Sequence, residues 1–338
     1  TGSLTQEHNQ MSKLAELRAA LLEAEQTKSG SKGASFDNAI YPHWNIDSGT
    51  STTLRFLPDA DPENVFFWKE RQMIRLPFSG IKGQDERKEV IVQVPCMEMW
   101  EPIGSCPVLR DIRPMYKANT NLDTAKKYWK KKSFLYQGFV TETTMVEEGE
   151  GISRNSIRRF IVSPSIQKII ETALMSPDYD ELPCHYDQGV DFRIIKTQKG
   201  EYADYSTSSY ARKERSLNQE ERDAIADHGL FDLKEFMPKK PTPEEVSIIE
   251  EMFHASFDGE LYDPERWGAY FRPSGMQFEG ATKTEITAQS VPNTDTTDDI
   301  PFEPDAKAEP KVKETVSASG AETGQKSAAD ILAAIRNR

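Results

Sequence analysis

The stretch from Lys126 to Val140, KKYWKKKSFLYQGFV, is the part of the chain around which the rest is organised. Five lysines alternate here with two aromatic residues, and the run continues into an apolar pattern over residues 134–140 that is typical of a β-strand. Lysines neutralise phosphates and rings stack on unpaired bases, so this combination favours binding of a single-stranded nucleic acid. A solvated charge run followed by a core strand is the alternative, which we prefer for Phe134 and Phe139.

Length and composition limit the fold. A chain of 338 residues can hold one large or two ordinary domains, and a hydrophobic content of 37% indicates that part of it does not pack. The net charge of −13 is unevenly distributed: residues 106–168 carry 12 basic and 6 acidic side chains, whereas residues 293–306 carry 5 acidic and no basic ones. We therefore expect a basic groove with acidic segments outside it.

The cysteine count and the hydropathy bear on the compartment. Cys96, Cys106 and Cys184 leave an odd number, which favours a reducing environment. No apolar run reaches the ~18 residues needed to span a bilayer, and no signal-peptide pattern precedes the first charged residues. We expect a cytoplasmic protein without membrane contact.

The two ends of the chain differ from its middle. Residues 1–10 precede the first methionine, and we interpret them as a cloning remnant. Residues 11–35 form an N-terminal arm, in which a helix with a leucine face leads into a Gly, Ser and Lys-rich linker. Because this helix cannot bury its apolar stripe alone, it should dock on its own core or on a neighbouring molecule. Residues 273–338 form an acidic tail of disordered composition that ends in a short helix pattern.

Between these ends, alternating apolar positions and turn residues predict an antiparallel barrel or sandwich with added helices. Strands are predicted at residues 44–46, 52–58, 65–74, 89–94, 134–142, 156–162 and 189–197, with a turn at 198–201 and a partly exposed returning arm at 202–210. Helices are predicted to start after the caps Ser163 and Thr242, and over 217–228. We expect the two acidic helices, 217–228 and 243–257, to pack on the barrel.

Two features leave alternatives open. Arg55 lies in an apolar strand, where it would make either a structural ion pair or a phosphate contact. Cys96 and Cys106 suggest zinc, but tetrahedral zinc needs four ligands and no histidine is close in sequence. We favour buried thiols for this pair.

Several landmarks occur in a fixed order along residues 36–210. They are Leu54-Arg55-Phe56-Leu57-Pro58, Ser105-Cys106-Pro107-Val108 with Cys96 before it, Lys130-Lys131-Lys132-Ser133, Arg158-Arg159-Phe160, Gly189-Val190-Asp191-Phe192 and Tyr202-Ala203-Asp204-Tyr205. No single landmark is specific. In this order and spacing, the chain resembles the single-stranded-DNA-binding, helix-destabilising proteins of T-even-type bacteriophages.

The resemblance implies an OB-fold core, a five-stranded antiparallel barrel, over residues 36–272, with an inserted zinc-type subdomain at 75–125. It also implies an arm that engages the next molecule for cooperative binding, and a tail that recruits replication and recombination proteins such as the polymerase, the helicase loader and the recombination mediator. The compartment would be the cytoplasm of the infected bacterial host. This chain departs from the family at Leu109, which stands where the third zinc-ligating cysteine is expected, so we interpret Cys96 and Cys106 as remnants and expect no cofactor, zinc included.

The site residues follow from the motifs and from the composition. By motif position or composition, the residues expected to contact DNA are Arg55, Tyr116, Tyr128, Trp129, Lys130, Lys131, Lys132, Tyr136, Arg158, Arg159, Tyr202 and Tyr205. Those expected to act in self-association are Lys13, Leu14, Leu17, Arg18 and Leu21. Those expected to contact partners from the tail are Asp298, Asp299, Phe302, Ile331, Leu332 and Ile335.

The acidic run around Phe302 resembles the tip of bacterial single-stranded-DNA-binding proteins, although it is internal here. We interpret this run as an electrostatic shield of the basic cleft and the terminal helix as a separate docking element; a partner-binding tip is the alternative. The function indicated is non-enzymatic, sequence-tolerant binding of single-stranded DNA. A metal-dependent nuclease or repair enzyme and an RNA-binding translational regulator are the rivals.

Overall fold

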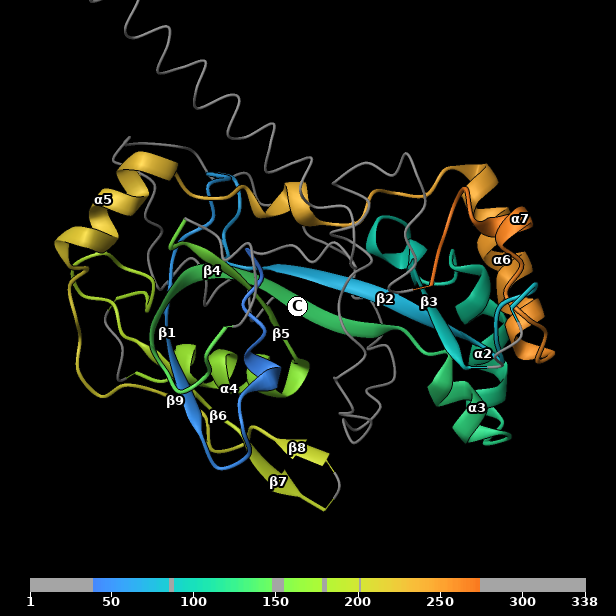
Figure 1. Ribbon diagram of the computed structural model, residues 1–338, viewed down its shortest axis with the longest axis horizontal. Helices are drawn as coiled ribbons and strands as arrows, with labels where there is room; N and C mark the ends of the chain where they lie inside the picture. The colour runs from blue at the N-terminus through green and yellow to red at the C-terminus, as the bar shows by residue number, and fades with distance from the viewer. Residues whose placement is uncertain (1–38, 85–87, 148–154, 178–180, 201, 274–338) are drawn as a thin grey trace, which may run out of the picture.

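The computed structural model describes residues 39–84, 88–147, 155–177, 181–200 and 202–273 (Figure 1). Over these residues the chain is mainly antiparallel sheet with added helices. The strands are β1 (Ser51–Phe56), β2 (Lys69–Phe78), β3 (Val90–Pro95), β4 (Lys131–Thr143), β5 (Arg158–Val162), β6 (Phe192–Ile195), β7 (Thr197–Lys199), β8 (Tyr202–Asp204) and β9 (Ser209–Tyr210). The helices are α2 (Pro107–Lys117), α3 (Leu122–Lys127), α4 (Pro164–Leu174), α5 (Gln219–His228), α6 (Pro243–Phe257) and α7 (Pro264–Trp267), with 3-10 turns η1 (His43–Asn45), η2 (Met97–Met99) and η3 (Leu233–Phe236).

The self-association residues and the partner residues of the tail lie outside the described residues. The predictions for residues 1–10, for the arm 11–35 and for the acidic run therefore stay predictions.

Strand β4 is the centre of the sheet, because it pairs with three other strands. Residues 134 and 135 pair with both β2 and β5, so these two strands lie on opposite edges of β4. Gly138 pairs with both Phe56 and Arg158, so β1 also lies opposite β5. One edge of β4 thus holds β2 and then β1, while the other edge holds β5.

The described strands pair along an open path from β3 through β2, β4, β1 and β6 to β9, with β5 attached to β4. Around β4 the order β5-β4-β1-β6-β9 forms a five-stranded set, with α4 between β5 and β6 in the sequence. The outer edge of β5 is taken by a parallel bridge, in which Arg159 exchanges backbone hydrogen bonds with Ala39 and Tyr41.

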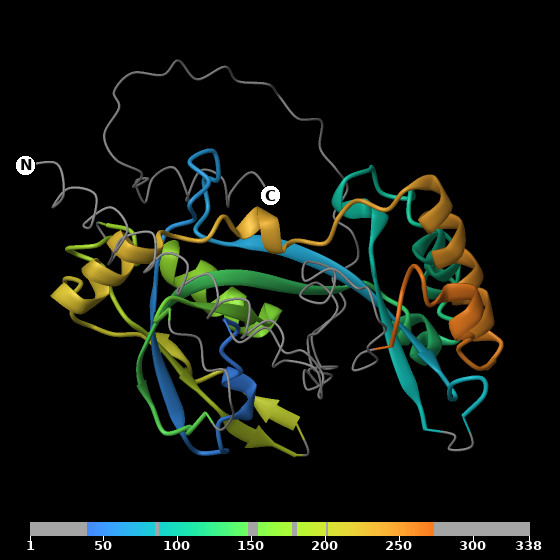
Figure 2. The ribbon, with the colours of Figure 1, turned by 45° about the horizontal axis from the view of Figure 1, so that its top comes forward.

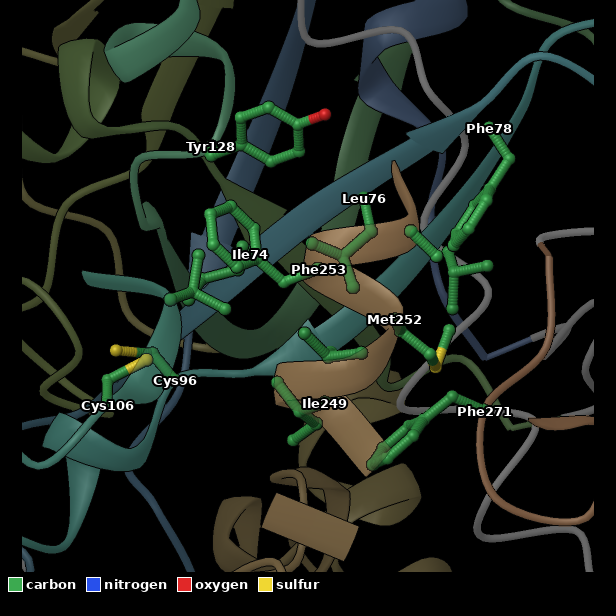
Figure 3. Packing of buried hydrophobic residues seen from close by; sticks show 14 of the residues in the cluster. Ile74, Leu76, Phe78, Cys96, Cys106, Tyr128, Ile249, Met252, Phe253 and Phe271 are labelled. Carbon is green, nitrogen blue, oxygen red and sulfur yellow. The ribbon is translucent and has the colours of Figure 1, made fainter. Parts of the chain in front are cut away.

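Two hydrophobic cores lie at the two ends of the β2–β4 ladder (Figures 1 and 2). The first core packs α4 against β1, β5 and β6, with Phe56, Tyr136 and Phe160 at its centre. The second packs α6 and α2 against β2 and β3. Figure 3 shows Ile249 and Phe253 of α6 facing the second core. We call the region around the first core the barrel lobe and the region around the second core the helical lobe.

Several sequence predictions hold and others are wrong. Helix α6 starts at Thr242 with a complete capping box, as predicted, and α4 starts directly after Ser163. Residues 44–46 were expected to be a strand, but η1 occupies this position because Pro42 and the following residues form a 3-10 turn. Helix α6 packs in the helical lobe and not on the barrel, since its apolar face meets β2. The 189–210 region is split into β6, a β7–β8 hairpin and β9.

A substitution at Gly138 tests the importance of the close approach of β4 to β1. An alanine Cβ at this position would lie 2.0 Å from the backbone oxygen of Arg55. The two strands could relieve this clash only by moving their backbones apart. Gly138→Ala should therefore lower the free energy of unfolding by about 1–3 kcal/mol or more, measured by denaturant unfolding. Thr144→Ala, at an exposed residue just beyond β4, should change it by less than about 0.5 kcal/mol. Equal effects of the two substitutions would contradict this packing.

Candidate nucleic-acid interface

The lysine cluster lies at the junction between the lobes, where α3 ends and β4 begins. Lys126 and Lys127 are exposed in the last turn of α3. Lys131 and Lys132 are the first two residues of β4, so their side chains point to opposite faces of the sheet. The Lys132 side chain is 47% exposed and pairs with Glu70 across the ladder, at 3.2 Å. One strand of nucleic acid therefore cannot contact both lysines from a single face.

Lys130 is neutralised inside the protein. Its Nζ lies 3.0 Å from a carboxylate oxygen of Glu98, which also accepts hydrogen bonds from Arg113 and from the backbone N–H of Gly104. Burial raises the pKa of Glu98, but the hydrogen bonds from Arg113, Gly104 and Lys130 outweigh it and the pKa is lowered. We interpret Lys130 as a structural partner of Glu98.

The aromatic rings in and beside the lysine cluster differ in burial: one is buried and two are half-buried. Tyr128 is buried against Phe253, and its hydroxyl lies 3.0 Å from the Ser256 hydroxyl. Trp129 is half-buried beside Tyr116 of α2, with ring centroids 6.0 Å apart. Of the three rings, Trp129 and Tyr116 are the ones that are not buried, and the Arg113 guanidinium lies 5.6 Å from the Trp129 ring centroid.

The other predicted stacking tyrosines also differ in burial. Tyr136 is fully buried in the barrel lobe, where its hydroxyl donates to Gln167, and Tyr205 is buried near His43. This arrangement fits the core-packing alternative for both. Tyr202 is 44% exposed on the β7–β8 hairpin, directly opposite Lys199.

Arg158 and Arg159 are both buried on β5. Arg158 donates to both carboxylate oxygens of Glu147, at 3.1 and 2.9 Å, and to the backbone oxygen of Ile40. The Arg159 guanidinium lies 3.5 Å from the ring centroid of Phe236. Arg158 is thus neutralised by Glu147, and Arg159 stacks on Phe236.

Arg55 is fully buried and makes the structural ion pair that the sequence left as one of two alternatives. Its Nη1 lies 3.3 Å from Asp191, and its Nη2 donates to the backbone oxygens of His185 and Arg215 at 2.7 Å each. Arg215 in turn binds Asp191 and Glu221 through both ends of its guanidinium. Burial lowers the pKa of Arg55, and the charge of Asp191 opposes that shift.

Gly189 leaves the space that Arg55 occupies. A Cβ at Gly189 would lie 2.5 Å from Nη2 of Arg55 and 2.3 Å from the backbone oxygen of His185. The Gly189-Val190-Asp191 landmark thus supplies both the carboxylate and the space for the guanidinium. This gives the motif a structural explanation that does not depend on DNA.

A substitution separates the two roles of Arg55. Arg55→Met should lower the free energy of unfolding by roughly 3–5 kcal/mol, because it leaves buried carbonyls and part of Asp191 without a donor. Gly189→Ala should act in the same direction. The salt dependence of DNA binding by the folded fraction should not change, as measured by titration at several salt concentrations. Arg193→Ala, on exposed β6 surface, is the control for stability. A stable Arg55→Met protein with a reduced salt slope would identify Arg55 as a phosphate contact.

The cysteine pair offers two of the four ligands that tetrahedral zinc needs. Figure 3 shows Cys96 and Cys106 side by side, and both are buried. The hydrogen bond from the Cys96 thiol, opposed by burial and supported by backbone N–H groups at the start of α2, lowers the pKa of Cys106 to about 7. Leu109 is buried in the same cluster, and no third ligating side chain joins the two thiols among the described residues. Two thiols cannot complete a tetrahedral site.

One acidic group has the spacing of a metal site. Asp59, Asp61 and Asp232 bring carboxylate oxygens within 4.8 Å of one another. Their oxygens accept local hydrogen bonds, including those from the backbone N–H groups of Leu233 and Lys234, and Lys69 pairs with Asp61 at 3.3 Å. We interpret the group as turn structure around η3.

Two cations that the sequence analysis did not select lie on β2. Arg71 and Arg75 are four positions apart in KERQMIRLPF, on the same face as Lys69 and Met73. The signal available in the sequence was the even spacing of Lys69, Arg71 and Arg75, which places basic side chains on one face of a strand.

Comparison of the chain with models of known protein families gives no match, and comparison with the curated proteins gives none either. The resemblance to the phage proteins therefore stays a prediction from the order of the landmarks. No helix in the described part of the chain is long and apolar enough to cross a membrane.

Proposed function

We propose that the chain binds single-stranded DNA with little sequence preference, without catalysis, and coats it during phage replication, recombination and repair. The observation that carries this proposal is the position of the exposed Lys126 and Lys127, three and two residues before the half-buried Trp129, which contacts Tyr116. Amines beside accessible rings suit a polymer of phosphates and unpaired bases. In the same proposal, neighbouring copies associate through the arm 11–35, and partner proteins bind the tail.

We also propose that the barrel lobe is an OB-type barrel, into which the segment of the helical lobe from β2 to α3 is inserted. The order β5-β4-β1-β6-β9, the helix α4 after the third of these strands in sequence, and the insertion of β2 to α3 between β1 and β4 support this assignment. Such barrels are partly open, and the bridge between β5 and residues 39–41 fits an opening between β5 and β9.

The binding preference tests the function directly. At equal length, single-stranded DNA should bind more tightly than duplex DNA or RNA in fluorescence titrations at several salt concentrations. Lys126→Ala with Lys127→Ala should flatten the logarithmic salt slope by about 1.4, at ~0.7 for each phosphate contact on a single strand. Lys240→Ala is the matched control, because Lys240 is an exposed lysine paired with Glu101.

Three outcomes would contradict the proposal. A preference for RNA would favour the translational regulator, and degradation of the DNA when magnesium is added would favour the nuclease. An equal change of slope in Lys240→Ala would mean that any surface charge has the same effect.

Ring contacts should be separable from charge. Trp129→Leu and Tyr202→Ala should each weaken binding by roughly 1–3 kcal/mol with little change in salt slope, because stacking involves no counterion release. Tyr128→Phe, which removes only the buried hydroxyl beside Trp129, should leave DNA affinity unchanged. Unchanged affinity in Trp129→Leu, measured in the same titration, would remove the Trp129 and Tyr116 pair from the site.

A further inference from the structure

The two faces of β2 have different environments. Ile74, Leu76 and Phe78 point into the core of the helical lobe, where they meet α6 (Figure 3). The alternate positions, which include Arg71 and Arg75, point to the opposite face. Opposite residues of an antiparallel ladder share a face, so Ser133 and Lys131 of β4, which pair with Arg71 and Met73, lie on this second face too.

The cations of this face differ in how they are neutralised. Lys69, at the start of β2, pairs with Asp61 at 3.3 Å and lies 3.9 Å from Asp59. Arg71 donates from Nε to the hydroxyl of Ser133 at 3.1 Å, which offers no charge. Neither Arg71 nor Arg75 is in ion-pair contact with any carboxylate of the described residues.

Among the described residues, this arrangement is costly without an anion. The Arg71 side chain is only 6% exposed, and a buried guanidinium is unfavourable unless a counter-charge compensates it. Burial, followed by the like charge of Arg75, lowers the pKa of Arg71 to about 10. A bound anion would relieve both the cost of burial and the effect of the like charge.

The spacing suits a chain of phosphates better than one phosphate ion. A strand rises about 3.3 Å per residue, so the Cα atoms of Arg71 and Arg75 lie about 13 Å apart along β2. Lys131 pairs with Met73, which lies between them. Guanidinium groups bind phosphate through two parallel hydrogen bonds, and an amine adds a point charge.

We propose that Arg71 and Arg75, with Lys131 between them, bind successive phosphates of the single-stranded DNA backbone. This inference rests on the proposed function and adds the residues that hold the backbone. The row of three cations lies where β4 begins. Arg71 and Arg75 are each two residues from Met73 on β2, and Met73 pairs with Lys131 of β4. Trp129 precedes that pair by two residues and Arg75 follows it by two, so the row and the ring pair lie at one end of the ladder.

The test uses the full chain with Arg71→Met and Arg75→Met combined, and with Lys69→Met as the control on the same strand face. The salt slope for single-stranded DNA should fall by about 1.4 in the double variant, at ~0.7 for each lost phosphate contact, and stay unchanged in the control. An abasic oligomer of the same length, which keeps the phosphates and lacks the bases, should show the same loss. An unchanged slope with both probes would overturn the inference while leaving the proposed function intact.

A second measurement separates binding from a structural role. Because Arg71 is a buried cation without a carboxylate partner among the described residues, Arg71→Met should keep or raise the melting temperature of the unliganded protein. Inorganic tripolyphosphate should raise the melting temperature of the original chain and not that of the double variant. A lowered melting temperature in Arg71→Met, together with an equal tripolyphosphate response, would show that the arginine is structural. If the original chain binds no single-stranded DNA, the proposed function fails, and the tripolyphosphate response alone decides whether the anion site exists.

Discussion

The fold depends on the hydrogen bonding of both edges of β4. This strand gives one edge to β2 and β1 in succession and the other to β5, so a single run of backbone connects the barrel lobe with the helical lobe. Its N-terminal end carries the lysine cluster, and its middle carries Gly138, where β1 comes too close for any side chain. The position of the cationic segment relative to both lobes is therefore determined by strand pairing, not by the segment itself.

Whether a basic side chain meets a carboxylate within the protein, rather than how many basic residues a segment has, separates structural cations from those that can bind an external anion. Arg55, Lys130 and Arg158 each meet a carboxylate within the protein, and these contacts hold distant parts of the chain together. Arg71 is buried equally well, but its described partner is a hydroxyl. A buried cation that pairs with a carboxylate costs little free energy and does not attract an external anion. A buried cation without such a partner keeps its affinity for an external anion.

The sequence predicted what depends on local pattern. Alternation located β1, β3, β4 and β5, and the capping box located the start of α6. The burial and the contacts of individual side chains were harder to predict, because they depend on partners far away in sequence. Lys130 meets Glu98, 32 residues earlier, and nothing in the lysine run reveals this pair. Tyr136 and Tyr202 both lie in segments that the sequence predicts to be extended, yet one is covered by α4 and the other lies on a hairpin.

The limits of the ladder also restrict the path of a bound strand. Lys131 and Lys132 point to opposite faces, so a strand following the backbone of β4 would meet only one of them. At the Met73–Lys131 pair, however, β4 separates from β2, and β3 takes up the other edge of β2. Only at this end can one polymer meet Arg75 on β2 and Trp129 before β4 without crossing a hydrogen-bonded ladder. Under the proposed function, this geometry favours a path that crosses the end of the ladder at the lobe junction.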